Sequence, residues 1–363
     1  MANTQKLYII FGIGRLGGEI VKALLHEGEE VLAVDIKEIA IRNLEDTKGI
    51  IHTLVLDGQP NRNFKMLEIK LKEIKNTKPI VGFHTFLYNP EDLQKWVDLM
   101  LPHTMSLGFM STTLGYDRSK IDFTKRSQIY ASDPKIDPEL NSSYGGYVNG
   151  KMQIEILAKR LEQKHAGLKF FVAEANHILG EGWPLGCAAS PGDVLFRRGD
   201  LLQTIRSGKI YIPFGGVNKI QGIHVADLSK MIALGMKFGY TGNYPLVSPE
   251  VWTVNQYFTI IADLINVDLR ILPADVTKVE KTLMMALNHM HGSTDLHKLF
   301  ENSGFKWKSL AESLKEMVDF YLLDESRPQN QKLITHLGQT DIGVKMNKLP
   351  LANPYQNIIQ KNT

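Results

Sequence analysis

The order of apolar and polar residues near the start of the chain predicts a strand, a turn, a helix and a second strand. Residues 7–11 form a continuous apolar run, which is typical of a strand buried on both faces of a parallel sheet. Apolar residues then recur at helical spacing through residues 20–25. A second apolar run covers residues 31–34 and ends in Asp35. This order of elements predicts an α/β fold with a parallel sheet.

The alternation of strands and helices continues through the chain. The next predicted elements, in chain order, are residues 78–86, 89–101, 106–113, 146–164 and 168–175. The first, third and fifth of these are apolar strands, and the other two are helices. Asn89 is the expected N-cap of the first helix and Pro90 its first residue. The pattern of apolar residues in 248–275 predicts an amphipathic helix followed by a strand. The helix would start at Ser248 or Thr253.

The turn between the first strand and the first helix carries a glycine motif. Gly12, Gly14 and Gly17 have the spacing G-x-G-x-x-G. The first glycine permits a tight turn, the second lets the backbone approach a pyrophosphate, and the third allows close helix–sheet packing. The N-terminus of the helix offers unpaired amides to phosphates. We therefore expect this turn, with Arg15 and Leu16, to bind a dinucleotide.

The acid at the end of the second strand indicates which dinucleotide is bound. The Asp35 carboxylate can accept hydrogen bonds from ribose hydroxyls and would repel a 2′-phosphate, so the sequence predicts NAD as the cofactor. Asp57 follows a predicted third strand, and it could either contact the adenine or be a polar loop residue. The alternative interpretation is a Rossmann-like domain that has lost its cofactor.

A tyrosine and a lysine on the predicted helix 146–164 are candidates for proton transfer. Tyr147 and Lys151 lie four residues apart and therefore share a helix face. A nearby ammonium lowers the pKa of a phenol from about 10, which would let the tyrosine exchange a proton with a substrate hydroxyl. Tyr144, seven residues before the lysine, is the alternative tyrosine. A hydroxyl from residues 111–113 at the preceding strand end would orient the substrate oxygen.

Together these features resemble the short-chain dehydrogenases/reductases, in their extended, epimerase/dehydratase-like branch. The stretches that carry the resemblance are the glycine turn with Asp35, FMSTTLGYD, YVNGKMQIE, ANHILGEGWP and IHVADLSKMI. They span roughly residues 6–323. The resemblance assigns the catalytic hydroxyl to Thr112, with Ser111 and Thr113 as close alternatives. It assigns to Lys151 a contact with the nicotinamide ribose.

The resemblance also implies a domain organisation and an activity. It implies a Rossmann-type doubly wound parallel sheet that binds NAD, with a smaller mixed α/β C-terminal lobe that binds substrate. Members of this branch transfer hydride at a hydroxyl-bearing carbon, most often of a nucleotide sugar, and often form homodimers through the helix that carries the tyrosine. We expect the NAD-binding domain at 1–180 with 218–248 packed back onto it, the substrate lobe at 181–217 and 249–325, and a tail at 326–363.

Departures from the family pattern leave other functions open. The family usually has G-x-x-G-x-x-G, the segment before residues 106–113 is shorter than usual, and Glu174 replaces the usual arginine. The alternatives are a simple NAD(P)-dependent dehydrogenase or reductase with a non-nucleotide substrate and a non-catalytic NAD-binding regulator. His177 could contact the cofactor or substrate, or could merely cap a strand end.

The composition of this chain of 363 residues argues against several classes of protein. Its net charge of +3 comes from mixed charges, unlike the clustered basic residues of nucleic-acid-binding proteins. No apolar run reaches the length of about eighteen residues that a membrane helix needs, and the N-terminus does not resemble a signal peptide. Cys187 is the single cysteine, and the spacing of the histidines near residue 290 matches no common zinc site. We therefore expect a cytoplasmic protein with a small-molecule substrate and without a metal.

Overall fold

The computed structural model describes most of the chain up to residue 325. The described residues are 5–36, 47–56, 60–75, 77–117, 120, 132–138, 146–175, 177–181, 183, 202, 205–217, 219–274 and 295–325. Several residues discussed above lie outside these ranges: Asp57, Tyr144, Cys187, His289, His291 and the tail from residue 326.

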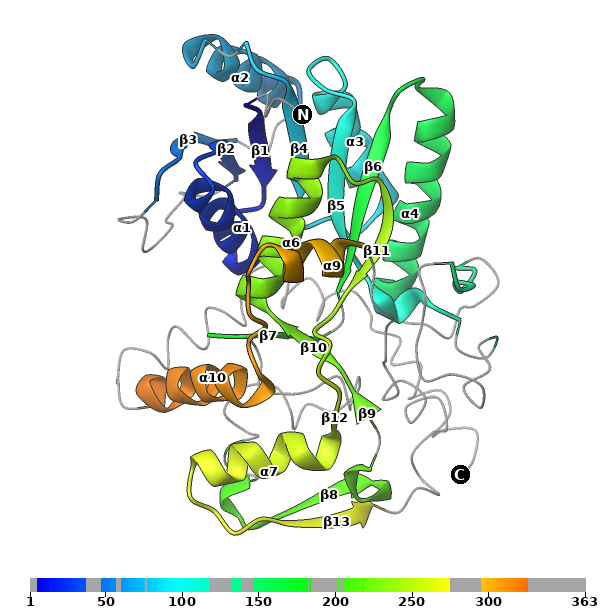
Figure 1. The fold of residues 1–363 in the computed structure, drawn as a ribbon. Coiled ribbons are helices and arrows are strands. Elements are labelled where there is room, and N and C mark those ends of the chain that lie inside the picture. Colours follow the sequence, from blue (N-terminus) through cyan, green and yellow to red (C-terminus); the bar gives the residue numbers. More distant parts are fainter. Residues whose placement is uncertain are drawn as a thin grey trace.

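A seven-stranded sheet forms the centre of the molecule (Figure 1), and its strands run in the order β11-β6-β5-β4-β1-β2-β3. The strands are β1 (Leu7–Phe11), β2 (Glu30–Asp35), β3 (Ile50–Val55), β4 (Ile80–His84), β5 (Ser106–Thr112), β6 (Lys169–Ala175) and β11 (Gly242–Leu246). Every neighbouring pair is parallel. The strand order reverses at β1, which is the topological switch point where open α/β sheets bind ligands. The predicted Rossmann-type fold is confirmed.

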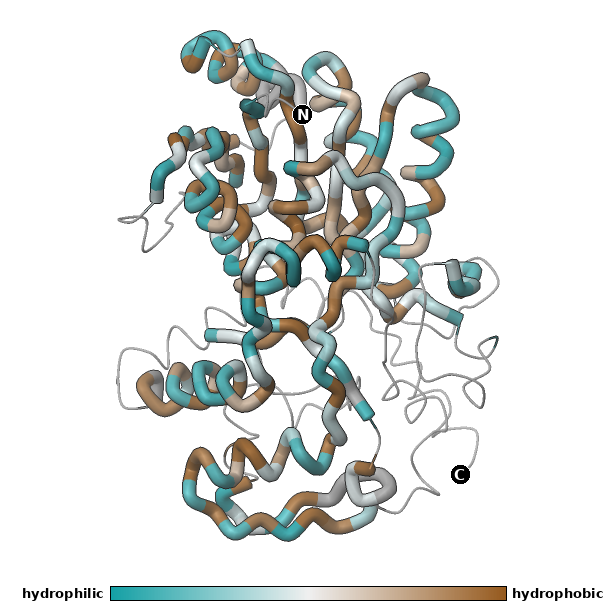
Figure 2. The backbone as a smooth tube through the Cα atoms, viewed as in Figure 1, coloured by the Kyte–Doolittle hydropathy of each residue, from teal (hydrophilic) through white to brown (hydrophobic). Residues whose placement is uncertain are grey.

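Helices cover both faces of the sheet. Successive side chains of a strand point to opposite faces, and apolar side chains on both faces of this sheet pack against helices. Tyr8 and Ile10 of β1 pack in a core with α1 and α6, whereas Leu7, Ile9 and Phe11 pack in a second core with α2, α3 and α4. Short α9 lies against α6 and adds Leu296 and Phe300 to the first core. The helices are α1 (Arg15–His26), α2 (Pro60–Glu73), α3 (Pro90–Met100), α4 (Gly146–Lys164), α6 (Val225–Phe238) and α9 (Asp295–Asn302). Figure 2 shows the result: the strands are mostly brown, and α4 alternates brown and teal segments.

Local side chains set the starts of several helices. Asn89 is the N-cap of α3, and its side chain accepts a hydrogen bond of 2.9 Å from the amide of Asp92, as the sequence predicts. Thr253 is the N-cap of α7 and forms a capping box with Gln256. His224 is the N-cap of α6, and its ring accepts a hydrogen bond from the Ala226 amide.

A smaller lobe lies beyond the carboxyl ends of the strands and has its own core (Figure 1). β13 pairs with β8 in parallel, β12 pairs with β9 in antiparallel orientation, and β10 pairs with β7 in parallel. Helices α7 and α10 pack together over this core. The remaining elements are η1 (Thr113–Gly115), β7 (His177–Leu179), β8 (Lys209–Pro213), η4 (Phe214–Gly216), β9 (Lys219–Ile220), β10 (Gly222–His224), β12 (Trp252–Thr253), α7 (Val254–Leu264), β13 (Arg270–Ala274) and α10 (Leu310–Glu325).

Polar contacts join the lobe to the sheet domain near the start of α6. The buried His224 ring lies 2.8 Å from the Glu316 carboxylate of α10. Asp227, in the first turn of α6, accepts a hydrogen bond of 2.9 Å from the Lys308 amide. His224 therefore connects the start of α6 to α10, the last described helix.

Candidate active site

The glycine turn has the geometry that the motif predicts. Gly12 has a φ of +81°, a left-handed conformation that favours glycine. A Cβ on Gly17 would lie 2.1 Å from the carbonyl oxygen of Gly12, so only glycine fits where α1 crosses the turn. A Cβ on Gly14 would meet nothing within 4 Å, so the backbone faces open space at the N-terminus of α1. This combination suits the approach of a pyrophosphate.

The side chains next to the glycine turn have different surroundings. Asp35 accepts a hydrogen bond of 2.6 Å from the Ile13 amide, which joins the end of β2 to the turn. Leu16 is 8% exposed and packs in the core, so only its backbone could face a cofactor. The Arg15 guanidinium lies 6.0 Å from the centre of the Phe320 ring in α10. Arg15 therefore contacts the C-terminal lobe from inside the glycine turn.

The three hydroxyl residues that follow one another at the end of β5 have different partners. Thr112 is hydrogen-bonded to the Tyr147 hydroxyl, and its own hydroxyl oxygen accepts a hydrogen bond of 3.2 Å from the Leu114 amide. Ser111 donates its hydroxyl hydrogen to the Glu155 carboxylate instead. Thr113 is fully buried, and its hydroxyl has no partner among the described residues. Only Thr112 of the three therefore joins the tyrosine of the predicted pair.

Tyr147 and Lys151 lie on one face of α4, as their spacing predicts. The Lys151 side chain is 3% exposed and donates a hydrogen bond of 2.9 Å to the Met110 carbonyl oxygen. Its Nζ lies 5.7 Å from the centre of the Tyr147 ring. Although 37% of Tyr147 is exposed, its hydroxyl has a hydrogen-bond partner in Thr112.

The protonation of this pair differs from the expectation drawn from the sequence. Burial raises the pKa of Tyr147 above its usual value, and the hydrogen bond with Thr112 opposes the shift. Burial also lowers the pKa of Lys151 to about 7, against the attraction of Glu155. The lysine therefore does not lower the pKa of the tyrosine here, because removal of both groups from water outweighs their mutual effect.

His177 lies at the start of β7 and faces the lobe. Its Nε2 is 3.5 Å from the Tyr257 hydroxyl of α7, and the two rings pack edge to face. Burial lowers the pKa of His177 to about 4, so the ring is neutral at neutral pH. The residue thus lies where the sheet domain passes into the lobe.

A buried ionic cluster lies behind the hydroxyl end of β5. Lys135 forms ion pairs with both Glu155 of α4 and Glu174 of β6. Asn243 of β11 donates to both carboxylates, 2.9 Å from that of Glu155, and Tyr116 donates a hydrogen bond of 2.6 Å to Glu174. Burial raises the pKa of Glu174 despite Lys135. The cluster connects β6, β11 and α4 to the loops that carry Lys135 and Tyr116.

Sequence reasoning did not identify this cluster. Glu174 interrupts the apolar stretch of β6, and a charge inside a buried strand is a signal that it needs a partner. Lys135 lies in a polar loop, and nothing in its neighbourhood distinguishes it from other exposed lysines. A cavity of about 310 Å³ opens beside the cluster and is lined in part by Lys135, Glu155 and Asn243.

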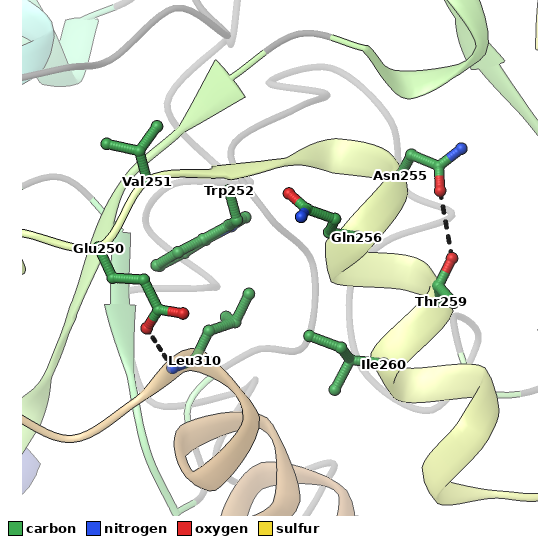
Figure 3. Close-up of a pocket in the computed structure, with 8 residues that line it drawn as sticks. All are labelled: Glu250, Val251, Trp252, Asn255, Gln256, Thr259, Ile260 and Leu310. Carbon is green, nitrogen blue, oxygen red and sulfur yellow. Dashed lines mark hydrogen bonds between the residues drawn. The ribbon is translucent and has the colours of Figure 1, made fainter.

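A second cavity, of about 350 Å³, lies entirely in the lobe (Figure 3). Residues near the start of α7 surround it, together with Leu310 at the start of α10. Its polar side chains are bonded within the protein: Glu250 accepts from the Leu310 amide, and Asn255 accepts from Thr259. None of the predicted site residues lines it. The predicted site residues therefore lie at the end of the sheet and apart from this cavity.

The described part of the chain has no grouping of side chains that would suit a metal ion. Within the same residues, no helix combines the length and apolar character that crossing a membrane requires.

Comparisons with known proteins support the fold. No family model matches the sequence, and no curated protein matches it. Solved structures match most of the chain. A UDP-N-acetylglucosamine 4-epimerase from Methanobrevibacter ruminantium M1, in complex with UDP-N-acetylmuramic acid, is 18% identical with a TM-score of 0.58, over 88% of this chain and 99% of that one.

Two further structures match in the same way. An epimerase from the thermophilic methanogen Methanothermobacter thermautotrophicus is 14% identical with a TM-score of 0.61, over 92% of this chain and 96% of that one. A UDP-glucose 4-epimerase from Thermus thermophilus, in complex with NAD, is 15% identical with a TM-score of 0.56, over 88% of this chain and 99% of that one. The chain therefore has the fold of the extended, epimerase-like short-chain dehydrogenases/reductases.

Proposed function

We propose that the protein is an NAD-dependent enzyme of the epimerase/dehydratase type that acts on a hydroxyl-bearing carbon of a nucleotide sugar. The observation that carries the proposal is the convergence of Thr112, Tyr147 and Lys151 at the carboxyl end of β5. A protein that only bound the nucleotide would have no need for this set. Solved structures with the same fold include complexes with NAD and with UDP-sugars.

The residues at the switch point fit NAD. The open space at Gly14 leaves room for a pyrophosphate at the N-terminus of α1, which has no acidic residue in its first turn. Asp35 stands at the end of β2, where it would accept hydrogen bonds from the adenosine ribose. Asp57 and His177 complete the proposed cofactor contacts. When bound there, NAD would accept a hydride from the substrate carbon and return it.

The side chains around the reacting carbon would move one proton. Tyr147 would first release its own proton to solvent. Its phenolate would then take the proton of the substrate hydroxyl as the hydride leaves, and the phenol so formed would give that proton back in the reverse step. Thr112 is already hydrogen-bonded to this phenol oxygen and would hold the substrate oxygen beside it. Lys151, charged in about half of the molecules at pH 7 when its pKa is about 7, would offset the negative charge on the phenolate.

Two further expectations belong to this proposal. A cytoplasmic setting suits a nucleotide-sugar enzyme. A homodimer would pair through α4, where Ile156 leaves 36% of an apolar side chain exposed. Sedimentation of the purified protein measures this assembly directly, and a monomer at all concentrations would contradict it.

The experiment starts from freshly purified protein that is denatured so that any released nucleotide can be identified by mass. The native protein is then incubated with UDP-glucose, UDP-galactose and their N-acetylated forms, and the products are followed by NMR. We expect bound NAD and interconversion of at least one pair. Tyr147→Phe should abolish interconversion and keep the bound NAD. Net formation of NADH without epimerisation would favour a simple dehydrogenase, and the absence of both nucleotide and turnover would overturn the proposal.

A further inference from the structure

The ammonium of Lys151 has an unusual set of close neighbours. It is buried and donates to one carbonyl oxygen, that of Met110, although an ammonium has three hydrogens to donate. Among the described residues, no carboxylate lies within ion-pair distance of its Nζ, and Glu155 acts on it only from further away. Among the described residues, the place next to the ammonium that a carboxylate would take is therefore held by other groups.

Two aromatic rings take this place. The Lys151 Nζ lies 5.1 Å from the centre of the Tyr88 ring and 5.7 Å from that of Tyr147. Both distances fall within the range in which a ring face attracts a cation. The two rings pack against each other with centres 5.8 Å apart and planes inclined by 54°. Tyr88 is the nearer of the two rings and comes from a different element, the loop between β4 and α3.

The neighbours of Tyr88 fix its ring in this position. A Cβ on Gly150, the residue before the lysine, would lie 2.2 Å from the Tyr88 carbonyl oxygen. The loop therefore touches the backbone of α4, and only a glycine permits that contact. On the other side, Phe86 packs edge to face on Tyr88, with ring centres 4.2 Å apart.

The other titratable groups around Lys151 do not replace the rings. His84 at the end of β4 is neutral, because burial and the lysine lower its pKa to about 3. Burial raises the pKa values of Tyr88 and Tyr147, so both rings are neutral phenols at neutral pH. Glu155 favours the charged lysine, but its carboxylate is shared with the Lys135 cluster. The Tyr88 ring is thus a neutral, close and rigid neighbour of the ammonium.

We propose that Tyr88 is a positioning residue whose ring face, and not its hydroxyl, keeps the Lys151 side chain cationic and directed at the Met110 carbonyl. The inference rests on the proposed function, because that function needs a cation beside Tyr147. It extends the function by giving the loop after β4 a part in the reaction. Since burial brings the pKa of Lys151 to about 7, a small loss of stabilisation lowers the fraction of the lysine that is charged at neutral pH.

The test compares Tyr88→Phe, which keeps the ring, with Tyr88→Leu, which removes it. Tyr88→Phe is the matched control, because it loses only the hydroxyl. Phe86→Leu is a graded variant, because it removes the ring that packs on Tyr88 and leaves the Tyr88 ring itself in place. The protein is labelled with ¹³C at lysine Cε, and the Lys151 resonance is assigned by its loss in Lys151→Arg. Its titration is then followed by NMR, together with the thermal melt of each variant as a check of folding.

We expect Tyr88→Phe to titrate as the parent protein does, and Phe86→Leu to shift less than Tyr88→Leu. Tyr88→Leu should titrate about half a unit to one and a half units lower, which is the strength of a cation–π contact expressed as a pKa change. In the pH profile of turnover, the alkaline limb of Tyr88→Leu should move down by the same amount. An unchanged midpoint in Tyr88→Leu, or an equal shift in Tyr88→Phe, would overturn the inference.

The NMR readout separates this inference from the proposed function. It uses no substrate, so a downward shift in Tyr88→Leu alone would uphold the contact between the ring and the lysine even if no nucleotide sugar were converted. Turnover with an unshifted titration would uphold the proposed function and refute the part assigned to Tyr88.

Discussion

The main-chain amide of Ile13 donates a hydrogen bond of 2.6 Å to Oδ2 of Asp35. The carboxylate at the end of β2 is thereby joined to the glycine turn at the end of β1. A carboxylate can accept about four hydrogen bonds, so Asp35 can hold the turn and still receive a ribose hydroxyl. The side chain that would select NAD therefore also helps to shape the turn that would bind its pyrophosphate.

Replacement of Asp35 should separate these two tasks. Asp35→Asn keeps an acceptor for the Ile13 amide but removes the charge, so we expect the preference for NAD over NADP to shrink while the thermal melt changes little. Asp35→Ala removes both, and NAD should bind about 10- to 100-fold more weakly, as for the loss of hydrogen bonds to a charged group. Calorimetric titration with both nucleotides measures the ratio. An unchanged ratio in both variants would show that Asp35 does not face the ribose.

Two neighbouring glycines of α1 offer a test of the turn geometry. In Gly17→Ala the new methyl would collide with the Gly12 carbonyl oxygen, which should lower the free energy of unfolding by about 1–3 kcal/mol. In Gly18→Ala the methyl meets nothing within 4 Å, and the better helix propensity should stabilise the protein by up to about 1 kcal/mol. Denaturant unfolding without added nucleotide compares them. Equal effects would contradict the close crossing of helix and turn.

Removal of the Thr112 hydroxyl and removal of the Thr113 hydroxyl should have different effects on turnover and on stability. Thr112→Val loses the hydrogen bond with Tyr147, and we expect turnover to fall about 100-fold or more, with partial recovery in Thr112→Ser. Thr113→Val removes a buried hydroxyl that lacks a partner among the described residues, so it should leave turnover intact and raise the free energy of unfolding by about 1 kcal/mol. Steady-state kinetics and denaturant unfolding give the two readouts. The reverse pattern would assign the reacting hydroxyl to Thr113.

Removal of Lys135 should have an effect that depends on pH. Lys135→Met leaves the carboxylates of Glu155 and Glu174 buried without their cation, which should destabilise the protein by about 3–5 kcal/mol when both are charged. The pKa of Glu174 is already raised, so the folded state holds this proton more firmly than the unfolded chain does. The unfavourable contribution of the charged Glu174 to folding is therefore absent near pH 4. It grows as the pH rises above the pKa that this glutamate has in the unfolded chain.

Unfolding of the parent protein and Lys135→Met by denaturant, at several pH values, measures the difference. The gap should widen from pH 4 to pH 8, and Glu174→Gln in the Lys135→Met background should close much of it. A gap that does not change with pH would show that Lys135 acts through packing and not through charge.

The sheet domain could be predicted because its signals are local. The apolar runs around residues 7–11 and 31–34 became β1 and β2, and Asn89 with Pro90 marked the start of α3. Each of these depends on residues within one turn or one strand. The i, i+4 spacing likewise placed Tyr147 and Lys151 on one face of α4.

The environment of the site could not be predicted in the same way. Tyr88, Lys135 and Asn243 reach it from three segments that are distant in sequence, and only the folded chain brings them together. The predicted protonation of Tyr147 was wrong for a related reason. Spacing gives the neighbour of a side chain but not the amount of water removed from it, and here burial outweighs the neighbour.

The outer edge of the central sheet is made by a strand that the chain supplies late. β6 ends at Ala175, and its neighbour β11 arrives only at residues 242–246, after the first strands of the lobe. Helix α6 comes with it, and its Gly235 leaves just enough room for the Phe171 ring. On the ribosome, a nascent chain that ends shortly after β6 would thus present a bare strand edge and an uncovered apolar face. The sheet can therefore be completed only after residue 246 has left the exit tunnel.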